Sequence, residues 1–211
     1  MGQGSYVIAE LDSVQEDNPE FQQALRNLDL HMIQKCNMDW SPRKFNLAKT
    51  LSPGTDEYGR TTIIPALFDD INGTQMATWR QTLLSTQTGH QTLITGTRTG
   101  NTLPEDFKVG WIGLAFPNKQ HHITEVKWQI GDRKFGRINL EEMRLYNKPA
   151  IIFSEGQVID EEESFHLYGY VDGPIPNQAP FITGVYQRIV MLGTAYFKVI
   201  SKLLGNCGAA I

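Results

Sequence analysis

The sequence predicts a mainly β protein: a jelly-roll-like antiparallel β-sandwich with an N-terminal arm and helix and a short connecting helix. The first observation is residues 108–171, where short apolar or alternating segments follow one another with turn residues between them. Within them, Val126, Trp128 and Ile130 alternate with polar residues, which is the period of a strand with one solvated face. Short strands separated by turns about every 8–12 residues are typical of sandwiches and barrels.

Composition divides the chain into an arm at residues 1–50, a sandwich at 51–204 and a small-residue tail at 205–211. Asn18-Pro19-Glu20 is typical of a helix start, and apolar residues at helical spacing after it predict a helix over about 19–35. A helix of this length needs a surface to pack on, either its own sheet or a neighbouring subunit. The candidates for contact with a neighbour are Tyr6, Val7, Ile8, Phe21, Leu25, Leu28 and Ile211.

In the sandwich, residues 58–68 are predicted to form the first strand. Residues 74–102 are rich in threonine, which favours strands, and the segment predicts a long polar β-ribbon. The pair Gly131-Asp132 predicts a tight hairpin between two strands. Asn139 is expected to cap a short helix over residues 140–146.

The apolar stretch at residues 181–204 fits either one helix or two strands hinged at Gly193-Thr194. Its β-branched residues and the glycine in its interior favour two strands.

Charge and length exclude several classes of protein. The net charge of −4 argues against a sequence-independent nucleic-acid binder, which needs a basic face. A basic group at Lys127, Arg133, Lys134 and Arg137 is better explained as a solvated hairpin. No apolar run reaches the roughly 18 residues of a membrane span, and no signal peptide is visible. The two cysteines, Cys36 and Cys207, give no disulfide framework and are expected to be free.

Two clusters of side chains suggest metal chemistry. His121, His122 and Glu125, with His166 as a distant partner, could form a site like that of a cupin. Adjacent residues of a strand point to opposite faces, so we expect surface histidines here and no metal or cofactor. The acidic run at residues 160–163 could bind a hard cation, but an exposed turn explains it more simply.

Trp40, Trp79, Trp111 and Trp128, with the tyrosines, could form a platform for stacking sugars. Trp111 and Trp128 lie in the most apolar strands, and this position favours core packing instead.

The strand series at 108–171, the turns at Gly131-Asp132 and Asp172-Gly173-Pro174, and the final strands at 181–204 together resemble the single jelly-roll capsid proteins of icosahedral viruses and phages. The resemblance implies eight strands in two sheets, contacts through edges and arms, and no catalytic residue.

We therefore expect a non-enzymatic structural subunit of a virion, assembled in the host cytoplasm from copies of itself and other shell proteins. The arm offers only Arg43, Lys44 and Lys49 as basic residues, so direct binding of nucleic acid is not expected. The alternatives are a soluble carbohydrate-binding β-sandwich module and a cupin-like metal-dependent enzyme.

Overall fold

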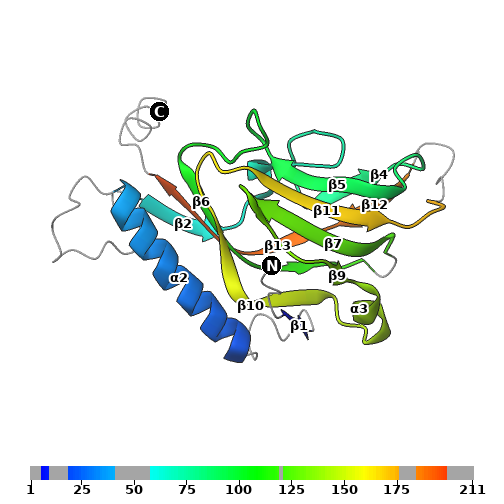
Figure 1. The fold of residues 1–211 in the computed structure, drawn as a ribbon, viewed down its shortest axis with the longest axis horizontal. Coiled ribbons are helices and arrows are strands. Elements are labelled where there is room, and N and C mark those ends of the chain that lie inside the picture. The colour runs from blue at the N-terminus through cyan, green and yellow to red at the C-terminus, as the bar shows by residue number, and fades with distance from the viewer. Residues whose placement is uncertain (1–5, 10–18, 41–57, 119–120, 176–183, 199–211) are drawn as a thin grey trace, which may run out of the picture.

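The computed structural model describes residues 6–9, 19–40, 58–118, 121–175 and 184–198 of the 211-residue chain. Two antiparallel sheets pack against one another around a shared core (Figure 1). Sheet A has the strand order β1 (Tyr6–Ala9), β10 (Ala150–Ile159), β6 (Phe107–Ala115), β13 (Val190–Lys198) and β2 (Tyr58–Thr62). Sheet B has the order β3 (Phe68–Asp69), β5 (Gly89–Gly96), β11 (Phe165–Val171), β7 (Ile123–Ile130) and β8 (Arg133–Lys134), and β9 (Ile138–Asn139) also pairs with β7.

The order in which the chain visits the sheets defines the topology. The strands β2, β5, β6, β7, β10, β11 and β13 alternate between sheet A and sheet B. Sheet A contains β2-β13-β6-β10 as neighbours, and sheet B contains β5-β11-β7-β8. Two four-stranded sheets wound in this way form a jelly roll, and the predicted fold class is confirmed.

Aromatic side chains fill the core between the two sheets. Trp111 is fully buried, and its ring centroid lies 4.9 Å from that of Phe153, 5.1 Å from Trp128 and 5.5 Å from Phe165. The Trp111 indole donates a hydrogen bond of 2.6 Å to the carbonyl of Gly113, so its polar atom is satisfied inside the core. The expectation of core packing for Trp111 and Trp128 is confirmed.

From Val109 to Ala115, strand β6 carries no polar side chain, because both of its faces are covered. Trp111 faces the sandwich core, whereas Ile112 belongs to a second buried cluster that is shared with α2 (Pro19–Trp40). The register of β13 against β6 skips Ile112, since Leu192 pairs with Gly113 and Gly193 pairs with Trp111. This β-bulge requires a positive φ of 145° at Gly193, which a side chain would rarely adopt.

The local expectations for the helices and the hairpin agree with the structure. The N-terminal helix begins at Pro19 as predicted but continues to Trp40, five residues beyond the expected end at 35. The short helix α3 (Glu141–Leu145) is capped by Asn139, whose side-chain oxygen accepts a 2.8 Å hydrogen bond from the Glu141 amide. The hairpin between β7 and β8 turns at Gly131, which has a φ of 54°.

Three strand predictions need correction. The predicted first strand at 58–68 is divided by the 3₁₀ turn η1 (Pro65–Leu67), because proline cannot donate to a sheet ladder. The predicted Thr-rich ribbon at 74–102 is absent as such: β4 (Arg80–Leu83) pairs with β12 (Val185–Arg188), and β5 pairs with β3 and β11. Residues 185–198 are two strands as predicted, but the break falls at Ile189 instead of Gly193.

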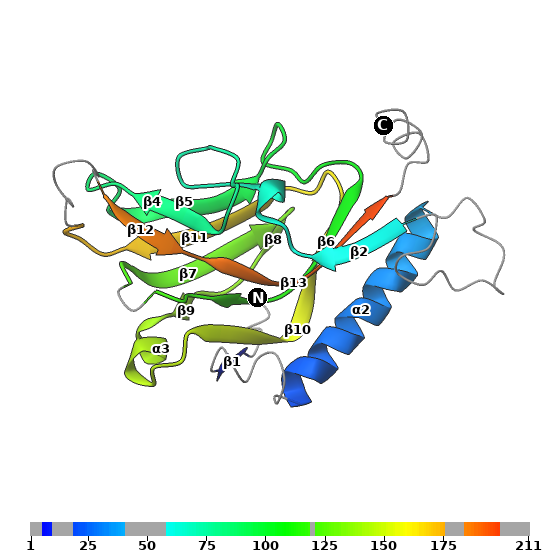
Figure 2. The same ribbon diagram turned by 180° about the vertical axis from the view of Figure 1, so that it is seen from behind.

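Helix α2 covers the outer face of sheet A, where it contacts β10, β6 and β13 (Figure 2). The strand β1 from the arm pairs with the edge strand β10, from Tyr6 opposite Phe153 to Ala9 opposite Ala150. Within the described residues, no helix is long and apolar enough to cross a membrane.

Candidate functional site

The contact between α2 and sheet A, here called the helix seam, has a tightly packed apolar centre. Two glycines make room for the helix. A Cβ on Gly110 would lie 3.1 Å from the Cγ atoms of both Leu28 and Met32, and one on Gly156 would lie 2.7 Å from Leu28. The helix can approach the sheet this closely because Gly110 and Gly156 carry no side chain.

Beside the apolar centre of the seam, a buried lysine meets three carboxylates. Lys108 is only 2% exposed, and its Nζ lies 2.9 Å from Asp39, 3.1 Å from Asp160 and 3.4 Å from Glu161. The same Nζ lies 5.1 Å from the centroid of the Trp40 ring. The Trp40 indole in turn donates to both carboxylate oxygens of Glu161 at 3.0 Å. This cluster ties the last turn of α2 to β6 and to the turn after β10.

The electrostatics of this cluster favour its ionised state. Burial alone would lower the pKa of Lys108, but hydrogen bonds to Asp39 and Asp160 outweigh burial and raise that pKa above its usual value. Burial would raise the pKa of Asp160, but hydrogen bonds from Lys35 and Lys108 outweigh it and lower that pKa. Lys108 and Asp160 therefore hold each other in their charged forms.

A second polar cluster lies midway along the seam, around Asp29. Its Oδ1 atom accepts hydrogen bonds of 3.0 Å from the hydroxyls of both Thr194 and Tyr196, and Arg60 pairs with its Oδ2 atom. Burial and the neighbouring charge of Asp29 raise the pKa of Tyr196 well above its usual range. Asp29 thus joins α2 to β2 and β13 at once.

The helix seam also contains a cysteine. Cys36 is buried within it as a free thiol, and burial raises its pKa to about 12, so the thiol stays neutral and unreactive. The expectation of a free, structural Cys36 is confirmed. Cys207 lies outside the described residues.

The histidines and the glutamate of the candidate metal cluster have separate partners. Glu125 pairs with Arg137 at 3.4 Å, and the His166 ring stacks on Tyr168 at a centroid distance of 5.6 Å. His122 lies at the start of β7, and its Nε2 atom is buried. Across the described part of the chain, no three His, Cys, Asp or Glu side chains are placed to hold a metal ion.

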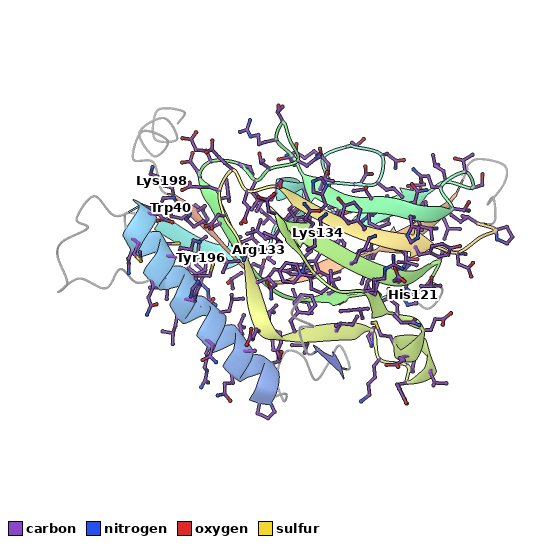
Figure 3. All side chains as sticks on the ribbon, viewed as in Figure 1. Trp40, His121, Arg133, Lys134, Tyr196 and Lys198 are labelled. Carbon is purple, nitrogen blue, oxygen red and sulfur yellow. The ribbon has the colours of Figure 1, made fainter. Side chains whose placement is uncertain are left out.

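His121 lines a pocket of about 330 Å³ beside α3. Its Nδ1 atom lies 3.2 Å from the side-chain nitrogen of the buried Gln187. The other lining residues are mostly apolar and come from the end of β6 and from α3 and its flanks: Phe116, Pro117, Asn118, Leu140, Met143, Asn147, Lys148 and Pro149. Figure 3 places His121 at the opposite end of the molecule from Trp40 and Tyr196.

Three tyrosines outside the core, Tyr168, Tyr170 and Tyr186, have ring partners within the chain. Tyr168 lies between the parallel ring of His166 and the Nζ atom of Lys127, which is 5.6 Å from its centroid. Arg80 covers the ring of Tyr186 at 4.4 Å, and the ring of His90 meets that of Tyr170 at 5.2 Å. These contacts occupy part of the ring surface of three tyrosines that a sugar would need for stacking, whereas Tyr146 is 61% exposed.

The same contacts bear on the basic hairpin. Arg133 pairs with Glu163 at 3.1 Å, Arg137 pairs with Glu125, and Lys127 lies over Tyr168. Arg133 and Arg137 have these partners and remain exposed to solvent, at 54% and 59%.

The interface candidates of the helix serve its own sheet. Phe21 and Leu28 are buried in the cluster shared with sheet A, and Leu25 packs against that cluster half-buried. The helix thus packs on its own sheet, which is one of the two surfaces that the sequence left open, and the contacts with a neighbour stay a prediction. Tyr6, Val7 and Ile8 lie in β1, which pairs with β10, and Ile211 lies outside the described residues.

Sequence reasoning missed Lys108, Asp29 and Asp39, and it explained residues 160–163 as an exposed acidic turn. The structure corrects this point for Asp160 and Glu161, which are only 28% and 27% exposed and pair with Lys108. A signal was present, since a lysine at the head of a continuous apolar strand needs a counter-ion if its side chain is buried.

Comparison of the chain with protein-family models, with curated proteins and with solved structures finds no match.

Proposed function

We propose that this chain is the structural subunit of a large homo-oligomeric shell of the viral capsid type. It assembles with copies of itself and with other shell proteins, in the host cytoplasm, and its place is the virion. The chain performs no catalysis in this role.

The observation that carries the proposal is the arm strand β1, added to the jelly roll at the edge of sheet A. Strand β1 extends the four jelly-roll strands of sheet A by pairing with β10 over four residues. An unpaired sheet edge is a template for another strand, and an arm that fills such an edge can do so within one chain or between chains. An edge and a strand suited to it are the elements that a self-assembling subunit needs.

The helix seam supports the same proposal. Its ion pairs and hydrogen bonds fix α2 to sheet A, which leaves the outward face of the helix as a defined and rigid surface. A subunit of a closed shell needs rigid surfaces, because the angle between neighbours sets the size of the shell.

The test is the mass of the native particle, measured by light scattering and imaged by negative-stain microscopy. We expect a particle of many subunits, whereas a 23.8 kDa monomer at high concentration would overturn the proposal. Deletion of residues 1–17 is expected to abolish assembly and to leave the β content in circular dichroism unchanged. A truncated chain that assembles like the full chain would remove the arm from the proposal.

A further inference from the structure

Exposed apolar side chains occur on the surface of α2 and at the end of α3. Among the described residues, the large hydrophobic side chains with high exposure are Leu30, Met38, Leu145, Tyr146, Tyr170 and Tyr186. Tyr170 and Tyr186 have ring contacts within the chain, with His90 and Arg80. The other four lie on α2 and at the end of α3, with exposed fractions of 60% to 76%. Leu145 and Tyr146 are adjacent in the chain, and exposed apolar side chains that lie together mark interaction sites more often than scattered ones do.

The exposed side chains at the end of α3 lie beside the pocket that His121 lines. Leu145 and Tyr146 lie in the chain between Met143 and Asn147, which both line the pocket of about 330 Å³. Leu145 is 76% exposed and Tyr146 is 61% exposed. An apolar side chain from a partner would therefore find a pocket to enter and two apolar side chains at its rim.

The charges beside the two places are complementary. On α2, the exposed Arg26 precedes Leu30 by four residues, so the two side chains are neighbours on one face of the helix. On α3, the exposed Glu141 precedes Leu145 by the same four residues, and Glu142 lies beside it. One surface thus offers a cation next to a leucine. The other offers two carboxylates next to a leucine, with Lys148 in the lining of the pocket.

The two surfaces lie too far apart to meet within one molecule. Both ribbon views place α2 toward one end of the long axis and α3 toward the other (Figures 1 and 2). A contact between two different surfaces of identical chains is heterologous, and such contacts build rings, shells or filaments in which every copy uses both surfaces.

We propose that the outward face of α2 in one copy docks on the α3 pocket of a second copy, with Leu30 at the pocket and Arg26 facing Glu141. This inference rests on the proposed function and names the contact through which the shell is built. The occupant of the α3 pocket is therefore another copy of this chain.

Charge reversal tests the contact. Arg26→Glu and Glu141→Lys are each expected to raise the protein concentration needed for assembly by at least about tenfold, as loss of an interface hot spot does. The double variant restores the opposite charges in exchanged positions, and we expect its assembly to return toward that of the wild type. Leu145→Asp, which changes the rim of the pocket, is expected to block assembly without repair by either charge variant.

Lys134→Glu is the matched control, because Lys134 is an exposed cation on β8 and belongs to neither of the two proposed surfaces. It is expected to assemble like the wild type, and circular dichroism checks that every variant is folded. If the wild type assembles and Arg26→Glu, Glu141→Lys and Leu145→Asp all assemble equally well, the docking contact is wrong and the proposed function stands. If the wild type stays a monomer, the proposed function itself fails, and the contact fails with it.

Discussion

Replacing Lys108 with methionine would test the electrostatic half of the helix seam. Methionine keeps most of the apolar stem of the lysine and removes its charge. Asp39, Asp160 and Glu161 then lose the cation that lies 2.9 to 3.4 Å from each of them. The three carboxylates remain close together and repel one another, while Lys35 still pairs with Asp160.

The structure sets the size of the expected loss. Removing one partner of a fully buried ion pair costs about 3–5 kcal/mol, because the remaining charge is stranded away from water. Here the carboxylate side chains keep 40%, 28% and 27% exposure, so water can solvate them in part. We therefore expect Lys108→Met to lower the free energy of unfolding by about 2 kcal/mol at pH 7. Asp39→Asn leaves Lys108 with two carboxylates and should cost less than about 1 kcal/mol.

The pH dependence gives a sharper test. The pKa of Asp160 is lowered below 3.8, so the stability that its charge contributes is present above this value and is lost as the pH falls through the folded-state pKa. The pKa of Lys108 is raised above 10.5, so its contribution is present below this value and is lost as the pH rises through the folded-state pKa. The cost of Lys108→Met should therefore be constant at neutral pH and shrink under strongly acidic or strongly basic conditions.

Urea unfolding followed by tryptophan fluorescence, at a series of pH values, measures this cost. A variant as stable as the wild type at pH 7 would refute the reasoning. So would a cost that stays the same from pH 7 down to strongly acidic pH.

Three further predictions concern the seam and the core. Gly110→Val places methyl groups against Leu28 and should lower the free energy of unfolding by about 1–3 kcal/mol, measured in urea. Adding Leu28→Ala to the same chain should relieve part of this loss, and strict additivity of the two changes would contradict the close approach. Tyr196→Phe removes one of the two hydroxyls that donate to Asp29 and should lower the free energy of unfolding by about 1 kcal/mol; an unchanged stability would show that the bond contributes nothing. Trp111→Ala should cost about 3–5 kcal/mol because the side chain is fully buried, and a loss below 1 kcal/mol in thermal or urea unfolding would mean that the core repacks.

The sequence was informative where the deciding contacts are local. The alternation of Val126, Trp128 and Ile130 predicted β7 correctly, because a strand with one wet face imposes its period on the residues themselves. The cap at Asn139 was predictable for the same reason, since the amide that it accepts from lies two residues away.

The sequence misled where one residue type serves two purposes. Gly193 was predicted to be a hinge between two strands, but it lies inside β13 at a bulge, and the break comes at Ile189. Glycine favours a turn and a bulge for the same reason, which is its tolerance of positive φ.

The candidate site could not be assembled from the sequence, because its partners are far apart along the chain. Lys108 and Asp160 are separated by 52 positions, and Trp40 and Glu161 by 121. Four successive acids predict a solvated turn unless a buried cation lies opposite, and only the folded chain shows that it does. The pairing of β4 with β12 instead of β5 is equally non-local.

The helix seam also sets an order of events during synthesis. Helix α2 lies near the start of the chain, but Asp29 bonds to Thr194 and Tyr196, which are 165 and 167 positions later. The helix is translated before the strand on which it docks, and its bonds to β13 can form only after the residues between Asp29 and Tyr196 have been made. Until then its apolar face has no completed sheet to cover it, and contacts of such long range are slow to form. The step that completes the helix seam is thus the docking of α2 onto a strand that is made long after it.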